Sequence, residues 1–178
     1  MNRLGRIALV LGGYAVALLA ATAAVAVWQM RTSGPDVQAM AGMYAFGDFA
    51  HFVGVFGVLA LVPTGFGLYF LRSCGKFWAP LSVVSLAIAM TSPVGVSIVP
   101  LAHVLRLRGP GWEIAGGLGF LRAMGAPLLA GGFFVGALVA PARRPRRALV
   151  TAACLELAGA LGVAIHFIMM RVNYGLFG

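Results

Sequence analysis

The sequence contains very few charged residues. Only 10% of its 178 residues are Asp, Glu, Lys or Arg, whereas a water-soluble domain contains about 25%. Hydrophobic residues make up 61% of the chain, and the mean hydropathy is +0.98. This composition excludes a water-soluble globular domain and indicates an integral membrane protein.

Acidic residues are especially scarce. Four acids stand against thirteen Lys and Arg residues, which gives a formal net charge of +9. The basic residues flank apolar segments instead of forming one patch, so we expect no role in nucleic-acid binding. They are instead expected to contact anionic lipid headgroups. The densest group of such residues is Arg143, Arg144, Arg146 and Arg147.

The sequence has few cysteines and lacks the motifs of familiar membrane enzymes. Cys74 and Cys154 are far apart in the sequence, and they predict neither a metal site nor a structural disulfide. The sequence has no H-E-x-x-H, no G-x-S-x-G and no G-x-x-x-x-G-K-[ST] motif. We therefore expect a protein without catalysis of its own.

Long apolar runs are abundant. A helix needs about 20 apolar residues to cross a hydrocarbon core of about 30 Å, whereas a barrel strand needs only about 10 alternating residues. Basic and turn-prone residues separate five runs of the helical length. The chain is thus predicted to be all-α, a single domain over residues 1–178 with five transmembrane helices. The expected spans are 7–28, 45–71, 77–99, 114–140 and 148–170.

The first apolar run has a second interpretation. Arg3 and Arg6 precede it, and the segment 24–26 (Ala-Val-Ala) resembles a small-residue cleavage site, so residues 1–26 are alternatively a secretory signal peptide. The run is longer than a usual signal core of about 7 to 15 residues, which favours a retained helix. Cleavage would leave four helices and would not change the placement of the later ones.

The basic residues also predict an orientation. Cytoplasmic flanks carry more Lys and Arg than external ones. Eight of the thirteen basic residues fall on the side of the amino terminus and five on the other side. We expect a multi-pass protein of the inner (plasma) membrane, with its amino terminus inside and its carboxyl terminus outside.

Small residues recur at helical spacing in the last two spans. Gly132 and Gly136 form a small-xxx-small pair in the fourth span. The fifth span carries a stripe of small residues around Glu156, namely Ala148, Ala152, Ala160 and Ala164. Small residues let helix backbones approach closely in lipid. They predict either an interface with a partner protein or contacts within the chain's own bundle.

The histidines and one acid are expected at a similar depth, near the outer side. Asp48 and His51 are three residues apart and so share a helix face. His166 lies at a similar level of the fifth span, and His103 follows the third span on the same side.

Two ligand chemistries fit this polar layer. A divalent metal such as zinc would accept the four residues Asp48, His51, His103 and His166. A b-type haem would instead use His51 and His166 as axial ligands, because glycines near both would let the porphyrin lie against the backbone. The remaining interpretations are that Asp48 and His51 satisfy each other or a backbone carbonyl, or that the groups form a proton or ion path.

Glu156 and Arg122 are the other expected buried polar residues. Glu156 is about ten residues from His166, or roughly 15 Å along a helix, so the two cannot share a small site. Glu156 is predicted to be a proton carrier, a salt-bridge partner of Arg122, or an acid held neutral by desolvation. Arg122 lies in the first third of its span, close to the outer interface. Its long side chain is expected to extend toward that interface, which argues against a pair with Glu156.

The sequence predicts a small accessory or interaction subunit of the membrane. The alternative is an electron-transfer protein that binds haem b or a metal ion through His51 and His166.

Overall fold

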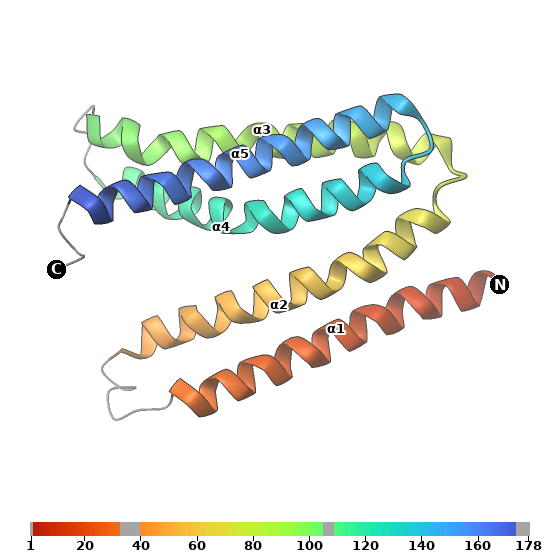
Figure 1. Cartoon of the computed structure of the whole chain (residues 1–178), viewed down its shortest axis with the longest axis horizontal. Coiled ribbons are helices and arrows are strands. Elements are labelled where there is room, and N and C mark those ends of the chain that lie inside the picture. Colours follow the sequence, from red (N-terminus) through yellow and green to blue (C-terminus); the bar gives the residue numbers. More distant parts are fainter. Residues whose placement is uncertain (1, 33–39, 105–108, 174–178) are drawn as a thin grey trace. The chain divides into compact units, whose positions relative to one another are not determined.

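The computed structural model describes residues 2–32, 40–104 and 109–173, and over these ranges it contains five helices and no strand. The helices are α1 (Arg3–Thr32), α2 (Ala41–Phe70), α3 (Gly75–Val104), α4 (Pro110–Val139) and α5 (Arg143–Asn173) (Figure 1). All five contain a segment that is long and apolar enough to cross a membrane. The predicted all-α class with five transmembrane helices is confirmed, and the chain is a multi-pass membrane protein.

The helices begin earlier than the apolar runs that predicted them. Each of α1 to α4 has 30 residues, which is about 45 Å of helix at 1.5 Å per residue. A hydrocarbon core of about 30 Å accommodates only part of that length. The apolar run marks the segment that suits lipid, whereas the backbone hydrogen bonds of the helix continue into the polar flanks.

Contacts between helices divide the chain into two compact units. The first, Met1–Leu71, contains α1 and α2 and is called the hairpin unit below. The second, Arg72–Gly178, contains α3, α4 and α5 and is called the bundle unit. The single-domain assignment from the sequence stays a prediction, and each unit is described separately.

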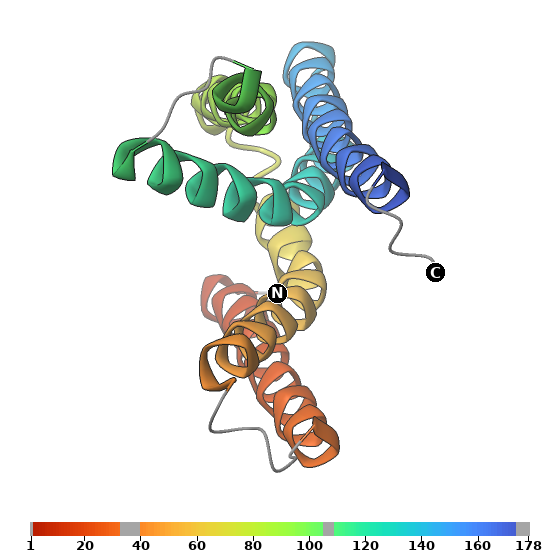
Figure 2. The same ribbon diagram turned by 90° about the vertical axis from the view of Figure 1, so that its left-hand side faces the viewer.

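In the hairpin unit, α1 and α2 lie side by side in opposite directions (Figures 1 and 2). Pro63 of α2 is buried against Gly13 of α1, where an added Cβ would lie 2.8 Å from the Pro63 Cβ. One residue further along each helix, the Tyr14 hydroxyl and the Thr64 hydroxyl share a hydrogen bond of 2.7 Å. Glycine at position 13 therefore gives the proline ring the room that close helix contact requires.

In the bundle unit, each of α3, α4 and α5 contacts the other two. Figures 1 and 2 show α4 on one side of the pair formed by α3 and α5. The interior consists largely of small side chains, among them Ala89, Ala126 and Ala152, which are fully buried. Large apolar side chains such as Leu138 and Leu161 are exposed, as expected of surfaces that face lipid.

Glycine sets the closest approaches of helices in the bundle unit. A Cβ on Gly119 of α4 would lie 2.7 Å from the carbonyl oxygen of Gly95 on α3. A Cβ on Gly159 of α5 would overlap the Ser92 hydroxyl of α3. Neither overlap leaves room for a larger side chain unless the helices move apart.

The predicted small-residue stripes divide between interior and surface. Gly136 and Ala152 are buried inside the bundle unit, so at these positions the stripes serve contacts within the chain. Ala164 is exposed, and a Cβ added to Gly132 would meet nothing within 4 Å.

Candidate functional site

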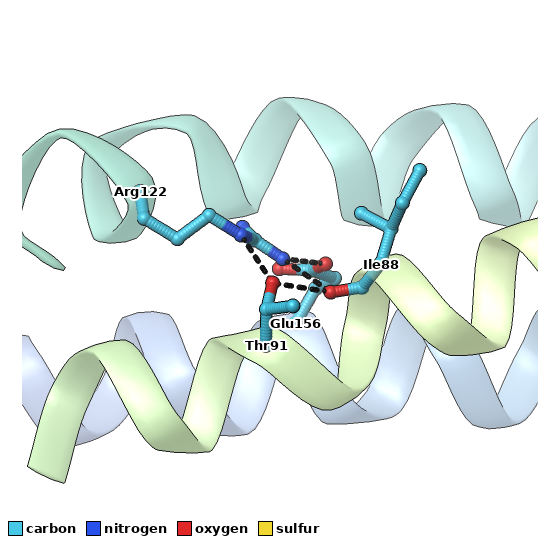
Figure 3. Close-up of polar contacts among 4 residues, drawn as sticks. All are labelled: Ile88, Thr91, Arg122 and Glu156. Carbon is cyan, nitrogen blue, oxygen red and sulfur yellow. Dashed lines mark hydrogen bonds and ion pairs between the residues drawn. The ribbon is translucent and has the colours of Figure 1, made fainter. Parts of the chain in front are cut away.

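A charged cluster joins the three helices of the bundle unit near their middles (Figure 3). Arg122 of α4 forms an ion pair with Glu156 of α5. The same guanidinium reaches the part of α3 that carries Ile88 and Thr91. Because each of these residues lies far from both ends of its helix, the cluster is at mid-depth of the unit.

The guanidinium of Arg122 distributes its donors over the other two helices. Its Nη2 donates to a carboxylate oxygen of Glu156 and, over 3.0 Å, to the carbonyl oxygen of Ile88. Its Nε donates to the hydroxyl of Thr91 over 3.0 Å. Thr91 in turn donates to the Ile88 carbonyl over 2.6 Å, which fixes its hydroxyl as an acceptor for the arginine. Arginine suits this position because its donors form a rigid planar fork.

Burial makes the ion pair important for the stability of the unit. Glu156 is fully buried, and the side chain of Arg122 is 21% exposed. Removing one partner of a buried pair typically costs about 3–5 kcal/mol, because the other charge is left without compensation. The pair therefore makes the arrangement of α3, α4 and α5 depend on both residues.

The cluster also has unused hydrogen-bonding capacity. Within the described residues, three buried side-chain atoms have no hydrogen-bond partner: Arg122 Nη1, Glu156 Oε2 and Ser92 Oγ. They comprise a donor, an acceptor and a hydroxyl that does both. The ion pair therefore does not use every hydrogen-bonding group of its two side chains.

Of the three predicted roles of Glu156, the structure shows the salt bridge to Arg122. Arg122 was expected near the outer interface because the predicted span began only at residue 114. Helix α4 begins at Pro110, so Arg122 is near its middle, and its side chain turns toward the interior.

The contribution of α3 to the cluster was missed in the sequence. A signal for it exists, because Ser82, Ser85, Ala89 and Ser92 recur at the spacing of one helix face. All four are buried. A face of small and hydroxyl-bearing residues within an apolar span indicates where other helices approach. Thr91, which bonds to Arg122, is exposed and does not belong to this face.

In the hairpin unit, Asp48 and His51 each contact a residue of α1. Asp48 is half-buried and accepts a hydrogen bond of 2.7 Å from Gln29 Nε2. His51 is exposed, and its ring stacks on Trp28 with centroids 4.6 Å apart and an angle of 17° between the planes. His51 therefore lies at the exposed edge of the contact between α1 and α2, and not in an interior.

The convergence of the three histidines stays a prediction. The side chains of His103 and His166 lie outside the described residues, and their helices belong to the bundle unit, whereas His51 belongs to the hairpin unit. Among the side chains that the structure describes, no group of three or more His, Cys, Asp or Glu is placed to hold a metal ion. The haem and metal hypotheses therefore remain to be tested in solution.

Comparisons with known proteins do not assign this chain to a family. No protein-family model, no curated protein and no solved structure matches it.

Proposed function

We propose that the chain is a small accessory or interaction subunit of a bacterial-type inner membrane, without catalysis of its own. The main support is that the charged residues of the cluster form contacts within the chain. Arg122 and Glu156 are the one ion pair among the described residues, and their contacts join α3, α4 and α5. Charged side chains that join helices of the same unit serve its structure, and this supports a role without catalysis.

The outer surface of α4 supports a role in assembly. A Cβ added to Gly117, Gly125 or Gly132 would meet nothing within 4 Å. Gly117 is exposed and Gly125 and Gly132 are half-buried, and the exposed side chains of the same helix include Leu118 and Leu121. In lipid, small residues at such positions let a helix from outside the bundle unit approach closely.

Assembly is tested on the chain extracted from its own membranes in mild detergent. We expect it to be recovered with other polypeptides at a fixed stoichiometry. Gly125→Leu should release them, whereas Val150→Leu, a small change at an exposed position of α5, should not. Recovery of the wild-type chain without any other polypeptide would contradict the proposal, as would equal recovery of partners with both variants.

The competing function is electron transfer through haem b or a metal ion, with His51 and His166 as ligands. It is distinguished by visible absorption and elemental analysis of the purified protein. We expect no Soret band and no stoichiometric metal. A Soret band with split peaks after reduction would overturn the accessory role.

We further propose that the amino terminus is inside and the carboxyl terminus outside. The four arginines at the start of α5 support this orientation, because such clusters are retained in the cytoplasm. A topology reporter inserted at Pro145 should report the inside, and one fused after Gly178 should report the outside. The opposite pattern would refute the proposed orientation.

A further inference from the structure

A cleft of about 570 Å³ lies in the bundle unit, between the start of α3 and the turn from α4 to α5. This volume is within the range of about 300–1,000 Å³ that is usual for small-molecule sites. The α3 side of the cleft is mostly apolar and includes Trp78, Val83 and Leu86. The other side includes Arg143 and Arg144.

The two sides of the cleft differ in the chemistry that they offer. Trp78 is buried and Leu86 half-buried, whereas Val83 is exposed, so together they form an apolar surface that is partly accessible from outside. Both arginines are exposed. Such a site suits a molecule with an apolar part and an anionic group, and it does not suit a wholly polar solute.

The described residues that line the cleft include two arginines and no acid. The chain has four acids, and none of them is in the segments that line the cleft. Glu156, on the same helix as the two arginines, is already paired with Arg122. The first turn of α5 adds the partial positive charge of a helix amino terminus. Arg143 and Arg144 are therefore available to an anion from outside the protein.

The cleft lies at one end of two candidate membrane spans. By length and composition, Gly75–Gly95 of α3 and Arg143–Ile165 of α5 are suited to cross a membrane, and the cleft is at the first residues of both. An end of such a span is expected near the boundary between headgroups and hydrocarbon. Tryptophan at position 78 is typical of this boundary, where its ring is apolar and its N–H is polar. A phospholipid places its phosphate and the start of its acyl chains at the same level.

We propose that this cleft binds an anionic phospholipid. The phosphate lies on the guanidinium groups of Arg143 and Arg144, and an acyl chain follows α3 past Trp78, Val83 and Leu86. This site requires only that the chain spans a membrane, so it does not depend on the proposed accessory role.

Trp78 is a natural reporter of the acyl chain. In a Trp28→Phe, Trp112→Phe background, Trp78 is the remaining tryptophan of the chain, and lipids with brominated acyl chains quench a tryptophan that they contact. The full-length protein is placed in vesicles of phosphatidylcholine that contain increasing amounts of brominated phosphatidylglycerol or brominated phosphatidylcholine. We expect phosphatidylglycerol to quench at a lower mole fraction, and equal quenching by the two lipids would overturn the proposal.

Charge variants separate this site from general attraction to the membrane. An arginine near an anionic surface contributes about 1 kcal/mol, which corresponds to about 5-fold in affinity for one residue and about 30-fold for two. Arg143→Gln with Arg144→Gln should reduce the preference for phosphatidylglycerol by up to that factor. The control, Arg3→Gln with Arg31→Gln, removes the same charge at exposed positions outside the cleft and should preserve the preference. An equal effect of both double variants would contradict a defined site.

Two further measurements test the apolar part of the site. Ala79→Phe places a larger side chain in the cleft without changing its charge, and it should reduce quenching by brominated phosphatidylglycerol. Inorganic phosphate at the same concentration should not displace the lipid, because it lacks the acyl chain. Full quenching in Ala79→Phe would contradict the proposed path of the chain, and displacement by phosphate would assign the arginines to a free anion instead.

Discussion

In the described part of the hairpin unit, each charged side chain that contacts the other helix has a neutral partner, whereas the bundle unit contains an ion pair. Arg6 lies over the ring of Phe70, 5.4 Å from its centroid. Asp48 of the hairpin unit has Gln29 as its partner, and Glu156 of the bundle unit has Arg122. Two helices share a seam but enclose no interior, so the carboxylate at that seam remains half-buried. A third helix creates an interior, and there Glu156 is fully buried.

The two units also differ in how close contact is achieved. In the hairpin unit, Gly13 faces a proline ring, and the buried residues of its described part are Ala17, Ala21 and Pro63. In the bundle unit, Gly119 faces the backbone of Gly95. An added atom that overlaps a backbone is harder to accommodate than one that overlaps a side chain, because the whole helix must then move. Substitutions of the same kind should therefore cost more in the bundle unit.

The largest expected effect is the loss of one partner of the ion pair. Glu156→Leu leaves the partly buried guanidinium of Arg122 without its carboxylate and should lower the free energy of unfolding by up to about 3–5 kcal/mol. The measurement is equilibrium unfolding of the full-length protein in detergent micelles titrated with a denaturing detergent. Replacing both residues, Arg122→Leu with Glu156→Leu, should recover most of the loss. A double variant as unstable as the single one would show that the pair is not what holds the helices together.

The next largest effect is expected where α3 and α4 are closest. Gly119→Ala places a Cβ 2.7 Å from the Gly95 carbonyl oxygen and should destabilise the unit by about 1–3 kcal/mol, the usual cost of overpacking. Gly117→Ala is the matched control, since its Cβ would meet nothing within 4 Å. The same unfolding titration measures both, and similar stabilities would disprove close contact at Gly119.

A smaller effect is expected from the corresponding change in the hairpin unit. Gly13→Ala brings a Cβ to 2.8 Å from the Pro63 Cβ, but two helices can separate slightly, so the cost should be near the lower limit of overpacking, about 1 kcal/mol. Gly12→Ala, one residue earlier, is unobstructed and should be neutral or slightly stabilising. A larger loss from Gly13→Ala than from Gly119→Ala would reverse the comparison of the two units.

The smallest effect is expected from the neutral hydrogen bond of the hairpin unit. Tyr14→Phe removes the bond to Thr64 but leaves the Thr64 hydroxyl donating to the Ala60 carbonyl. Hydrogen bonds between membrane helices average about 0.6 kcal/mol, and the loss of stability should be of that size. Tyr69→Phe, at an exposed position, is the control and should leave the unfolding curve unchanged.

The polar sites were less predictable than the helices. The face shared by Asp48 and His51 follows from their spacing, but their contacts with Gln29 and Trp28 depend on how α1 and α2 are aligned. Likewise, Arg122 and Glu156 are each recognisable as costly in lipid, and the sequence allowed three roles for Glu156. The choice among these roles depends on the direction in which α4 presents its side chain.

The sequence by itself determined the membrane class, the number of helices and their approximate positions, because a continuous apolar run is a local property that lipid selects directly. The tertiary structure decided which polar groups meet. Thr91, Arg122 and Glu156 belong to three helices, and their contacts follow from the rotation and alignment of those helices. Rotation and alignment arise from close contacts such as those of Gly95 with Gly119 and of Ser92 with Gly159, which join residues distant in the sequence.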